Sequence, residues 1–115
     1  AQVAYEPAGW PLVIYSGEDP AGFMLLYDAR KDQEDPAEQL YIWRLMVDAR
    51  YQRLGLGRRA IDWVVEEARR MGLPVVGLSH VMAAGHAGPF YEKLGFAYNG
   101  KIDAGEHEMV LRVLD

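Results

Sequence analysis

The loop at residues 52–57, with the sequence QRLGLG, holds the residues whose types and spacing best suit chemistry. It follows an apolar run and leads into a helical pattern that begins at residue 58. The first turn of a helix leaves backbone N–H groups unpaired at its positive end. Gly55 and Gly57 lack the Cβ atoms that would keep a pyrophosphate from the backbone, and arginines at positions 53, 58 and 59 add positive charge beside them. The pattern therefore predicts an anion site, with a pyrophosphate as the expected ligand.

The two glycines also allow other interpretations. Residues 55–60 fit the G-x-G-x-x-A dinucleotide pattern, but the eight residues 48–55 separate the first glycine from the preceding strand. No acidic residue that would hold a ribose lies between Glu67 and Glu92. A nucleoside-triphosphate loop is excluded, because no Gly-Lys-Ser/Thr sequence ends the segment. The simplest alternative is a tight turn into a helix, with no ligand.

Composition and charge narrow the class of protein. The 115 residues, half of them hydrophobic, predict one compact domain over residues 1–115. No apolar stretch approaches the roughly 20 residues that span a bilayer, so we expect a soluble, cytoplasmic protein with no membrane partner. The net charge of −5 argues against nucleic acid as a partner. We expect no metal site, because the chain has no cysteine and no histidine pair with ligand spacing.

Hydrophobic periodicity predicts the elements that position the loop. Apolar runs at residues 10–16 and 23–27 form a hairpin across a cluster of turn residues, and acidic loops near residues 18–19 and 32–38 are expected to be solvated. Residues 40–47 read as a central strand covered on both faces. The rest of the chain predicts a helix at 58–71, a strand at 75–81, a helix at 89–94 and a strand pair at 96–98 and 107–114 across a Gly-rich connection. The fold class is α/β (α+β), with a mixed central sheet flanked by helices.

A second motif makes the loop more specific. Residues 52–57 match Gln/Arg-x-x-Gly-x-Gly/Ala at every defined position. About 30 residues later, a second set supplies Ala-x-x-x-Tyr and Lys-x-Gly-Phe: Ala87, Tyr91, Lys93, Gly95 and Phe96. Together these motifs resemble the GNAT N-acetyltransferase superfamily from about residue 11 to the end of the chain. Residues 43–48 and 100–106 look like the bacterial branch of spermine/spermidine acetyltransferases.

The resemblance implies a GNAT fold, apparently lacking its N-terminal strand and helices, and acetyl-CoA as cosubstrate. Backbone groups of Met46 and Val47 would pair with the pantetheine arm like an added strand. The remaining expected cofactor-binding residues are Gln52, Arg53, Leu54, Gly55, Leu56, Gly57, Arg58, Tyr91 and Lys93. The family usually has an Asn where this chain has Ala84, and an acidic residue common in the branch is absent from residues 81–84.

The implied reaction is direct attack of a primary amine on the thioester, which requires an acid and a base. Tyr91 would donate a proton to the departing sulfur, although as an isolated residue it reads as a core aromatic. An alkylammonium has a reference pKa near 10.4, so a base must first remove a proton. The candidate bases are Glu106, Glu108, Asp103 and His80, of which Glu108 also suits the solvent face of an edge strand and His80 a structural role.

The expected function is acetyl transfer to a small primary amine, with a polyamine favoured as the acceptor. The alternative is a non-catalytic CoA-binding or interaction module of the same fold. The start of the chain, residues 1–5, looks like the tail of a helix. We expect upstream residues or a symmetric homodimer partner to cover aromatic surface carried by the first three strands. Its members are Trp10, Tyr15, Phe23, Tyr27, Tyr41 and Trp43.

Overall fold

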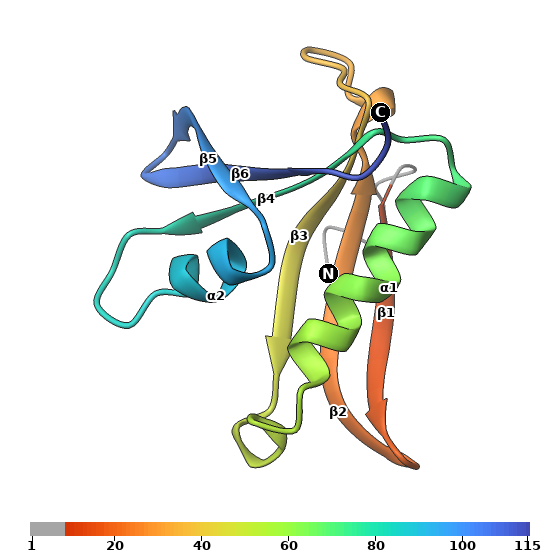
Figure 1. Cartoon of the computed structure of the whole chain (residues 1–115), viewed down its shortest axis with the longest axis vertical. Helices are drawn as coiled ribbons and strands as arrows, with labels where there is room; N and C mark the ends of the chain where they lie inside the picture. The colour runs from red at the N-terminus through yellow and green to blue at the C-terminus, as the bar shows by residue number, and fades with distance from the viewer. Residues whose placement is uncertain (1–8) are drawn as a thin grey trace.

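The computed structural model describes residues 9–115, in which one six-stranded sheet carries two helices (Figure 1). The strands are β1 (Gly9–Ser16), β2 (Asp19–Asp28), β3 (Gln39–Val47), β4 (Val75–Val81), β5 (Ala97–Asp103) and β6 (Glu106–Arg112). The helices are α1 (Leu56–Arg70) and α2 (Gly88–Lys93), with short 3₁₀ turns η2 (Ala29–Lys31) and η3 (Ala49–Tyr51). The order of strands and helices is the one that the sequence predicts. The helix tail expected at residues 1–5 lies outside the described residues.

The sheet is mixed, as predicted, with the spatial order β1-β2-β3-β4-β6-β5. Only β3 and β4 run parallel, and α1 connects them as a crossover, while every other neighbouring pair is antiparallel. One expectation is wrong: the strand that carries Glu108 is not an edge. The final hairpin joins the sheet through β6, which lies between β4 and β5, so β5 forms the edge instead.

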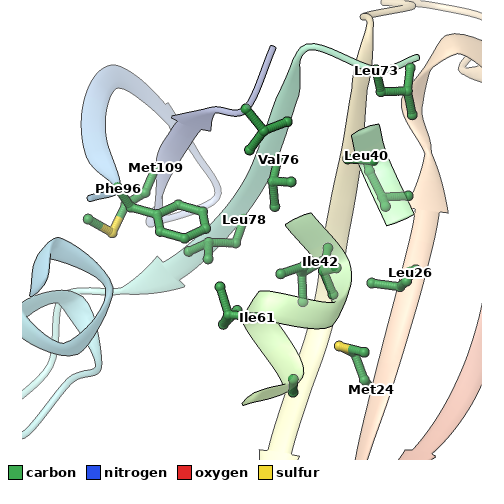
Figure 2. Close-up of a cluster of buried hydrophobic side chains, with 14 residues drawn as sticks. Met24, Leu26, Leu40, Ile42, Ile61, Leu73, Val76, Leu78, Phe96 and Met109 are labelled. Atoms are coloured by element: carbon green, nitrogen blue, oxygen red, sulfur yellow. The ribbon is translucent and has the colours of Figure 1, made fainter. Parts of the chain in front are cut away.

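Both helices pack on a single hydrophobic core. The amphipathic face of α1 contributes Ile61 and Val64, while α2 adds the partly buried Tyr91 and the residue after the helix adds Leu94. Figure 2 shows the side chains that meet them from the sheet and its connections: Met24, Leu26, Leu40, Ile42, Leu73, Val76, Leu78, Phe96 and Met109. The core therefore lies between the helices and one face of the sheet.

The opposite face of β3 is open, which contradicts the expectation of a strand covered on both sides. Trp43 and Met46 are 41% and 59% exposed, and Arg44 is exposed as well. The apolar sequence of β3 predicts burial, but both helices of the described residues lie on the other face of the sheet. This open face becomes part of the candidate site.

The expected aromatic surface is divided rather than continuous. Tyr15 and Phe23 are exposed, but Tyr27 is 8% exposed and stacks on Trp43 with ring centroids 4.7 Å apart. Trp10 packs against the main core. Alternation along the strands puts Trp10 on the helix side, whereas Tyr27, Tyr41 and Trp43 share the opposite face.

Two connections are tighter than the sequence suggests. The turn between β1 and β2 is only Gly17-Glu18, so the turn-rich residues 19–22 belong to β2. The Gly-rich connection expected before β6 is instead the two-residue turn Ala104-Gly105, in which both residues have positive φ, 51° and 80°. Two central residues with positive φ make a type I′ turn, whose twist matches that of the flanking strands. Asp103 and Glu106 therefore face each other across paired strands.

Candidate active site

The parallel strands β3 and β4 diverge beyond their paired stretch, and the region between their diverging ends is called the cleft. The two strands pair only over Gln39–Ile42 and Val75–Leu78. Beyond that point β3 stays with β2, whereas β4 stays with β6, and the two halves of the sheet separate visibly (Figure 1). Among the described strands none pairs with the edge of β3 that faces the cleft beyond Ile42. Unpaired backbone groups at this edge can accept an extended ligand.

A β-bulge at Trp43 accompanies the divergence. Leu25 is opposite Arg44 and Leu26 is opposite Ile42, which leaves Trp43 as the extra residue. Such a bulge bends its strand and increases the local twist. Met46 and Val47 lie beyond the bulge on the stretch of β3 that borders the cleft, where the sequence predicts backbone contacts with the pantetheine arm.

The predicted anion loop joins the end of β3 to α1. Gly55 caps the helix with φ 77°, a left-handed conformation that favours glycine, and no side chain caps the helix N-terminus. The first backbone N–H groups of α1 are therefore left to a ligand or to water. The arrangement has the features of a diphosphate site.

The side chains of the loop have different surroundings. Gln52 Nε2 donates to the carbonyl oxygen of Val47 at 3.1 Å, so this amide ties the loop to the end of β3. Leu56 is buried in the sheet-facing side of α1, whereas Leu54 is 57% exposed. Arg53 has a φ of 72°. The exposed arginines that surround the loop are Arg53, Arg58 and Arg59.

Tyr91 lies on α2, on the same face of the sheet as α1. Its ring makes edge contacts with Phe90 and Phe96, at centroid distances of 5.3 and 5.8 Å. Burial raises the pKa of Tyr91, so the phenol keeps its proton throughout the neutral range. A protonated phenol in a half-buried position can donate a hydrogen bond or a proton but cannot act as a base. Lys93, at the end of the same helix, is exposed.

His80 has both ring nitrogens engaged. Nδ1 lies 3.2 Å from the carbonyl oxygen of Val81, which can only accept, so Nδ1 is the donor. Nε2 lies 2.9 Å from the hydroxyl of Tyr98, and the ring stacks on His86 with centroids 5.1 Å apart. In this tautomer the basic nitrogen already has a partner. The geometry therefore favours a structural role for His80, whose centroid is 6.5 Å from that of Tyr91.

The candidate carboxylates gather on the other face of the sheet, in an open hollow of about 870 Å³. Alternation along β4 places Ser79 on the hollow and its neighbour His80 towards the helices. Six acidic residues line the hollow: Asp32, Glu34, Asp35, Asp103, Glu106 and Glu108. The sequence predicts Asp103, Glu106 and Glu108 as base candidates, and the structure brings these three together.

Two side-chain hydrogen bonds connect the segments that line the hollow. Lys101 Nζ donates to Asp35 at 2.9 Å, which connects β5 to the loop before β3. The hydroxyl of Tyr41 donates to that of Ser79 across the point where β3 and β4 diverge. The loop that carries Asp35 is exposed, as expected of a solvated loop, and it also lines one side of the hollow.

Sequence reasoning missed Tyr41 and Ser79 as site residues. They are 38 positions apart and belong to no motif. Alternation along each strand could have placed them on the open face, but their contact depends on the parallel register of β3 and β4. That register puts Tyr41 opposite Gly77, two residues before Ser79.

Diverging parallel strands, with an uncapped helix start at one end, fit the architecture of an acyl-CoA transferase. Residues 2–96 match the family described as Acetyltransferase (GNAT) family. The chain belongs to this family, whose acetyl donor is acetyl-CoA, and the recognition made from the two motifs is confirmed.

Individual relatives extend the comparison. The chain is 25% identical over 112 residues to the spermine/spermidine N(1)-acetyltransferase of Bacillus subtilis (strain 168), covering 96% of this chain and 71% of that protein. It also resembles the structure of a Bacillus subtilis acetyltransferase in complex with CoA, with a TM-score of 0.77 and 18% identity, over 96% of this chain and 81% of the other. A Thermoplasma acidophilum PaiA N-acetyltransferase in complex with coenzyme A gives a TM-score of 0.75 and 16% identity, over 96% and 65%.

These likenesses confirm the GNAT fold. The chain spans between 65% and 81% of the lengths of these three relatives. Within residues 9–115, no helix combines the length and apolar character needed to cross a membrane.

Proposed function

We propose that the chain transfers the acetyl group of acetyl-CoA to a primary amine of a small cationic molecule, with a polyamine as the leading acceptor. The observation that carries the proposal is the carboxylate-lined hollow on the open face of the sheet, beside the cleft. A cationic acceptor would be attracted there by charge, while the donor would approach from the helix side. The relative from Bacillus subtilis, described as acting on spermine and spermidine, supports the same acceptor class.

The residues present suit acetyl-CoA as the donor. The uncapped N-terminus of α1 and three arginines offer donors to a diphosphate. The cleft-facing edge of β3 at Met46 and Val47 offers backbone groups to an amide-containing arm. When bound, acetyl-CoA supplies an activated acyl group on a thiol leaving group.

The proposed step needs no covalent link to the protein. The ammonium of the acceptor first loses one proton to a base. Its nitrogen then bonds to the acetyl carbon as the carbon–sulfur bond breaks, and the sulfur takes a proton from Tyr91. The amide nitrogen releases its second proton, which restores the phenol through solvent, so one amine is acetylated and one proton is released overall. Positioning and hydrogen bonding to the developing oxyanion would supply most of the acceleration.

Thiol release from acetyl-CoA, measured with a panel of amines, tests this function. The panel contains spermidine, an aminoglycoside and an amino-acid amine, and calorimetry measures CoA binding in parallel. We expect release with spermidine to exceed that with the other amines. CoA binding without turnover on any amine would contradict the proposal. It would favour a non-catalytic CoA-binding module, an interpretation for which the alanine at position 84, in place of the usual Asn, provides a reason.

A further inference from the structure

Two hydroxyl groups meet at the vertex of the cleft. Tyr41 belongs to the last paired stretch of β3, and Ser79 is the first residue of β4 beyond that stretch. The Tyr41 hydroxyl donates its hydrogen to the Ser79 oxygen, and both side chains line the open hollow. With Tyr41 as the donor, its oxygen is left with lone pairs free to accept, and Ser79 with a hydrogen free to donate.

A carboxylate lies next to Ser79 on the neighbouring strand. Ser79 and Glu108 are directly opposite in the β4–β6 ladder. Side chains in this relation lie close enough for a hydroxyl to reach a carboxylate directly or through one water. The side chain of Glu108 is held by Asn99, whose Nδ2 donates to Oε1 at 2.6 Å. This bond occupies one carboxylate oxygen and leaves the other for Ser79.

The surroundings keep Tyr41 protonated. Burial raises the pKa of Tyr41, the Ser79 hydrogen bond opposes this shift, and the charges of Glu108 and Glu106 add to it while Lys101 works against it. A neutral phenol can pass a proton along a chain of hydrogen bonds, because it can accept on oxygen while it donates its own hydrogen. Tyr41 donates to Ser79, and Ser79 lies opposite Glu108, so the three residues can supply an ordered series of acceptor and donor groups that ends on a carboxylate.

We propose that the Tyr41–Ser79 hydroxyl pair carries the proton of the acceptor ammonium to Glu108, which acts as the general base of the acetyl transfer. The inference rests on the proposed function. The ammonium N–H donates to the Tyr41 oxygen, Tyr41 passes its hydrogen to Ser79, and Ser79 passes its own to Glu108. Both hydroxyls end neutral and Glu108 ends as a carboxylic acid, which returns its proton to water in the open hollow. Glu106, opposite Val81 rather than Ser79, binds the acceptor by charge alone.

The test compares Glu108→Gln with Glu106→Gln, measuring kcat and KM for spermidine from pH 6 to 10. Glutamine keeps an oxygen for Asn99 but cannot take a proton. We expect Glu108→Gln to lower kcat by about 10²-fold or more at pH 7. The deficit should shrink towards pH 10, where the free amine becomes abundant because its pKa is near 10.4. Glu106→Gln should raise KM and leave the pH profile of kcat as in the wild type.

A second acceptor and a second pair of variants separate a relay from a structural role. An α-amine, with a reference pKa of about 7.7–8.0, should lose less activity in Glu108→Gln than spermidine does at pH 7. Tyr41→Phe and Ser79→Ala should each reproduce the pH-dependent loss, with CoA affinity and melting temperature close to the wild type. A loss that is the same at every pH, or equal in Glu108→Gln and Glu106→Gln, would overturn the relay while wild-type turnover upholds the proposed function. A wild-type protein that is inactive on every amine would contradict both the relay and the proposed function.

Discussion

Tyr91 fits two roles, a packed core aromatic and a proton donor, and only a test of its chemistry can distinguish them. Its ring packs against Phe90 and Phe96 as a core aromatic would, yet its phenol lies on the helix side of the cleft with its pKa raised by burial. The raised pKa keeps the phenol protonated at neutral pH, so it has a proton to donate to a departing sulfur. The motif in the sequence identified this residue, and packing alone would not have done so.

Tyr91→Phe should therefore lower kcat by about 10²-fold, in the range typical of general acids. The affinity for CoA and the melting temperature should change little, because the ring and its packing are retained. Steady-state kinetics at saturating acetyl-CoA, with calorimetry for CoA, measures both. An equal kcat in the wild type and in Tyr91→Phe would mean that Tyr91 serves only in packing.

Gly57→Glu should abolish CoA binding without unfolding the chain. A Cβ at this position would meet Phe90 Cζ at 3.4 Å, an ordinary contact, so the first side-chain carbon fits without displacing the backbone. The added carboxylate would lie at the uncapped start of α1, where the diphosphate is expected, and would repel it. Gly57→Ala is the matched control and should bind CoA nearly as well as the wild type in calorimetry. Undiminished binding by the glutamate variant would exclude the loop as the phosphate site.

The residues found by sequence and by structure differ for a physical reason. The loop at residues 52–57 and Tyr91 belong to local motifs, whose chemistry follows from neighbouring residues. Tyr41 and Ser79 lie on different strands, and their position beside Glu108, which the sequence did suggest as a base, depends on parallel and antiparallel registers that no local pattern encodes. The same holds for the structural role that the geometry favours for His80, because its partner Tyr98 is 18 positions away.

At the scale of elements, β3 links the two halves of the site. Its first half pairs with β4 and positions Tyr41, and its second half stays with β2 and leaves its cleft-facing edge free. The sequence predicted the strand and its length closely, because the apolar run shows where the strand begins and ends. It did not predict the bulge at Trp43 or the open face, because these depend on which neighbours cover the strand.

Gly22 tests how tightly β2 and β3 must approach beyond the bulge. It pairs with Val47, and a Cβ at this position would overlap the carbonyl oxygen of Met46, a backbone atom that cannot rotate away. Gly22→Ala should therefore shift the end of β3, lowering the free energy of unfolding by about 1–3 kcal/mol, the usual cost of overpacking. CoA affinity should fall as well, because Met46 and Val47 border the cleft. Denaturant unfolding and calorimetry measure the two effects, and wild-type values for both would show that the strands can separate without consequence.

At the scale of the whole molecule, the sheet separates two chemical environments. The helix side presents arginines and an uncapped helix start, suited to an anion, while the open face gathers six carboxylates around one hollow. The net charge of −5 matches the second environment rather than the first. The donor and the acceptor would thus approach from opposite faces, each guided by charge of the opposite sign, and meet at the cleft between β3 and β4.

If the hollow attracts the acceptor by charge, kcat/KM for a cationic acceptor should depend on the salt concentration. At saturating acetyl-CoA, raising NaCl from 20 to 300 mM should lower kcat/KM for spermidine by about 10-fold, because screening shortens the reach of the carboxylates from roughly 20 Å to under 10 Å. A monoamine carries one charge and should lose much less. Asp103→Asn combined with Glu106→Gln, which removes two charges from the hollow, should reduce the salt dependence. Glu66→Gln, on the exposed face of α1, removes a charge far from the hollow and should leave that dependence as in the wild type. A salt dependence that is equal for the monoamine and spermidine, or equally reduced by Glu66→Gln, would mean that overall charge rather than the hollow attracts the acceptor.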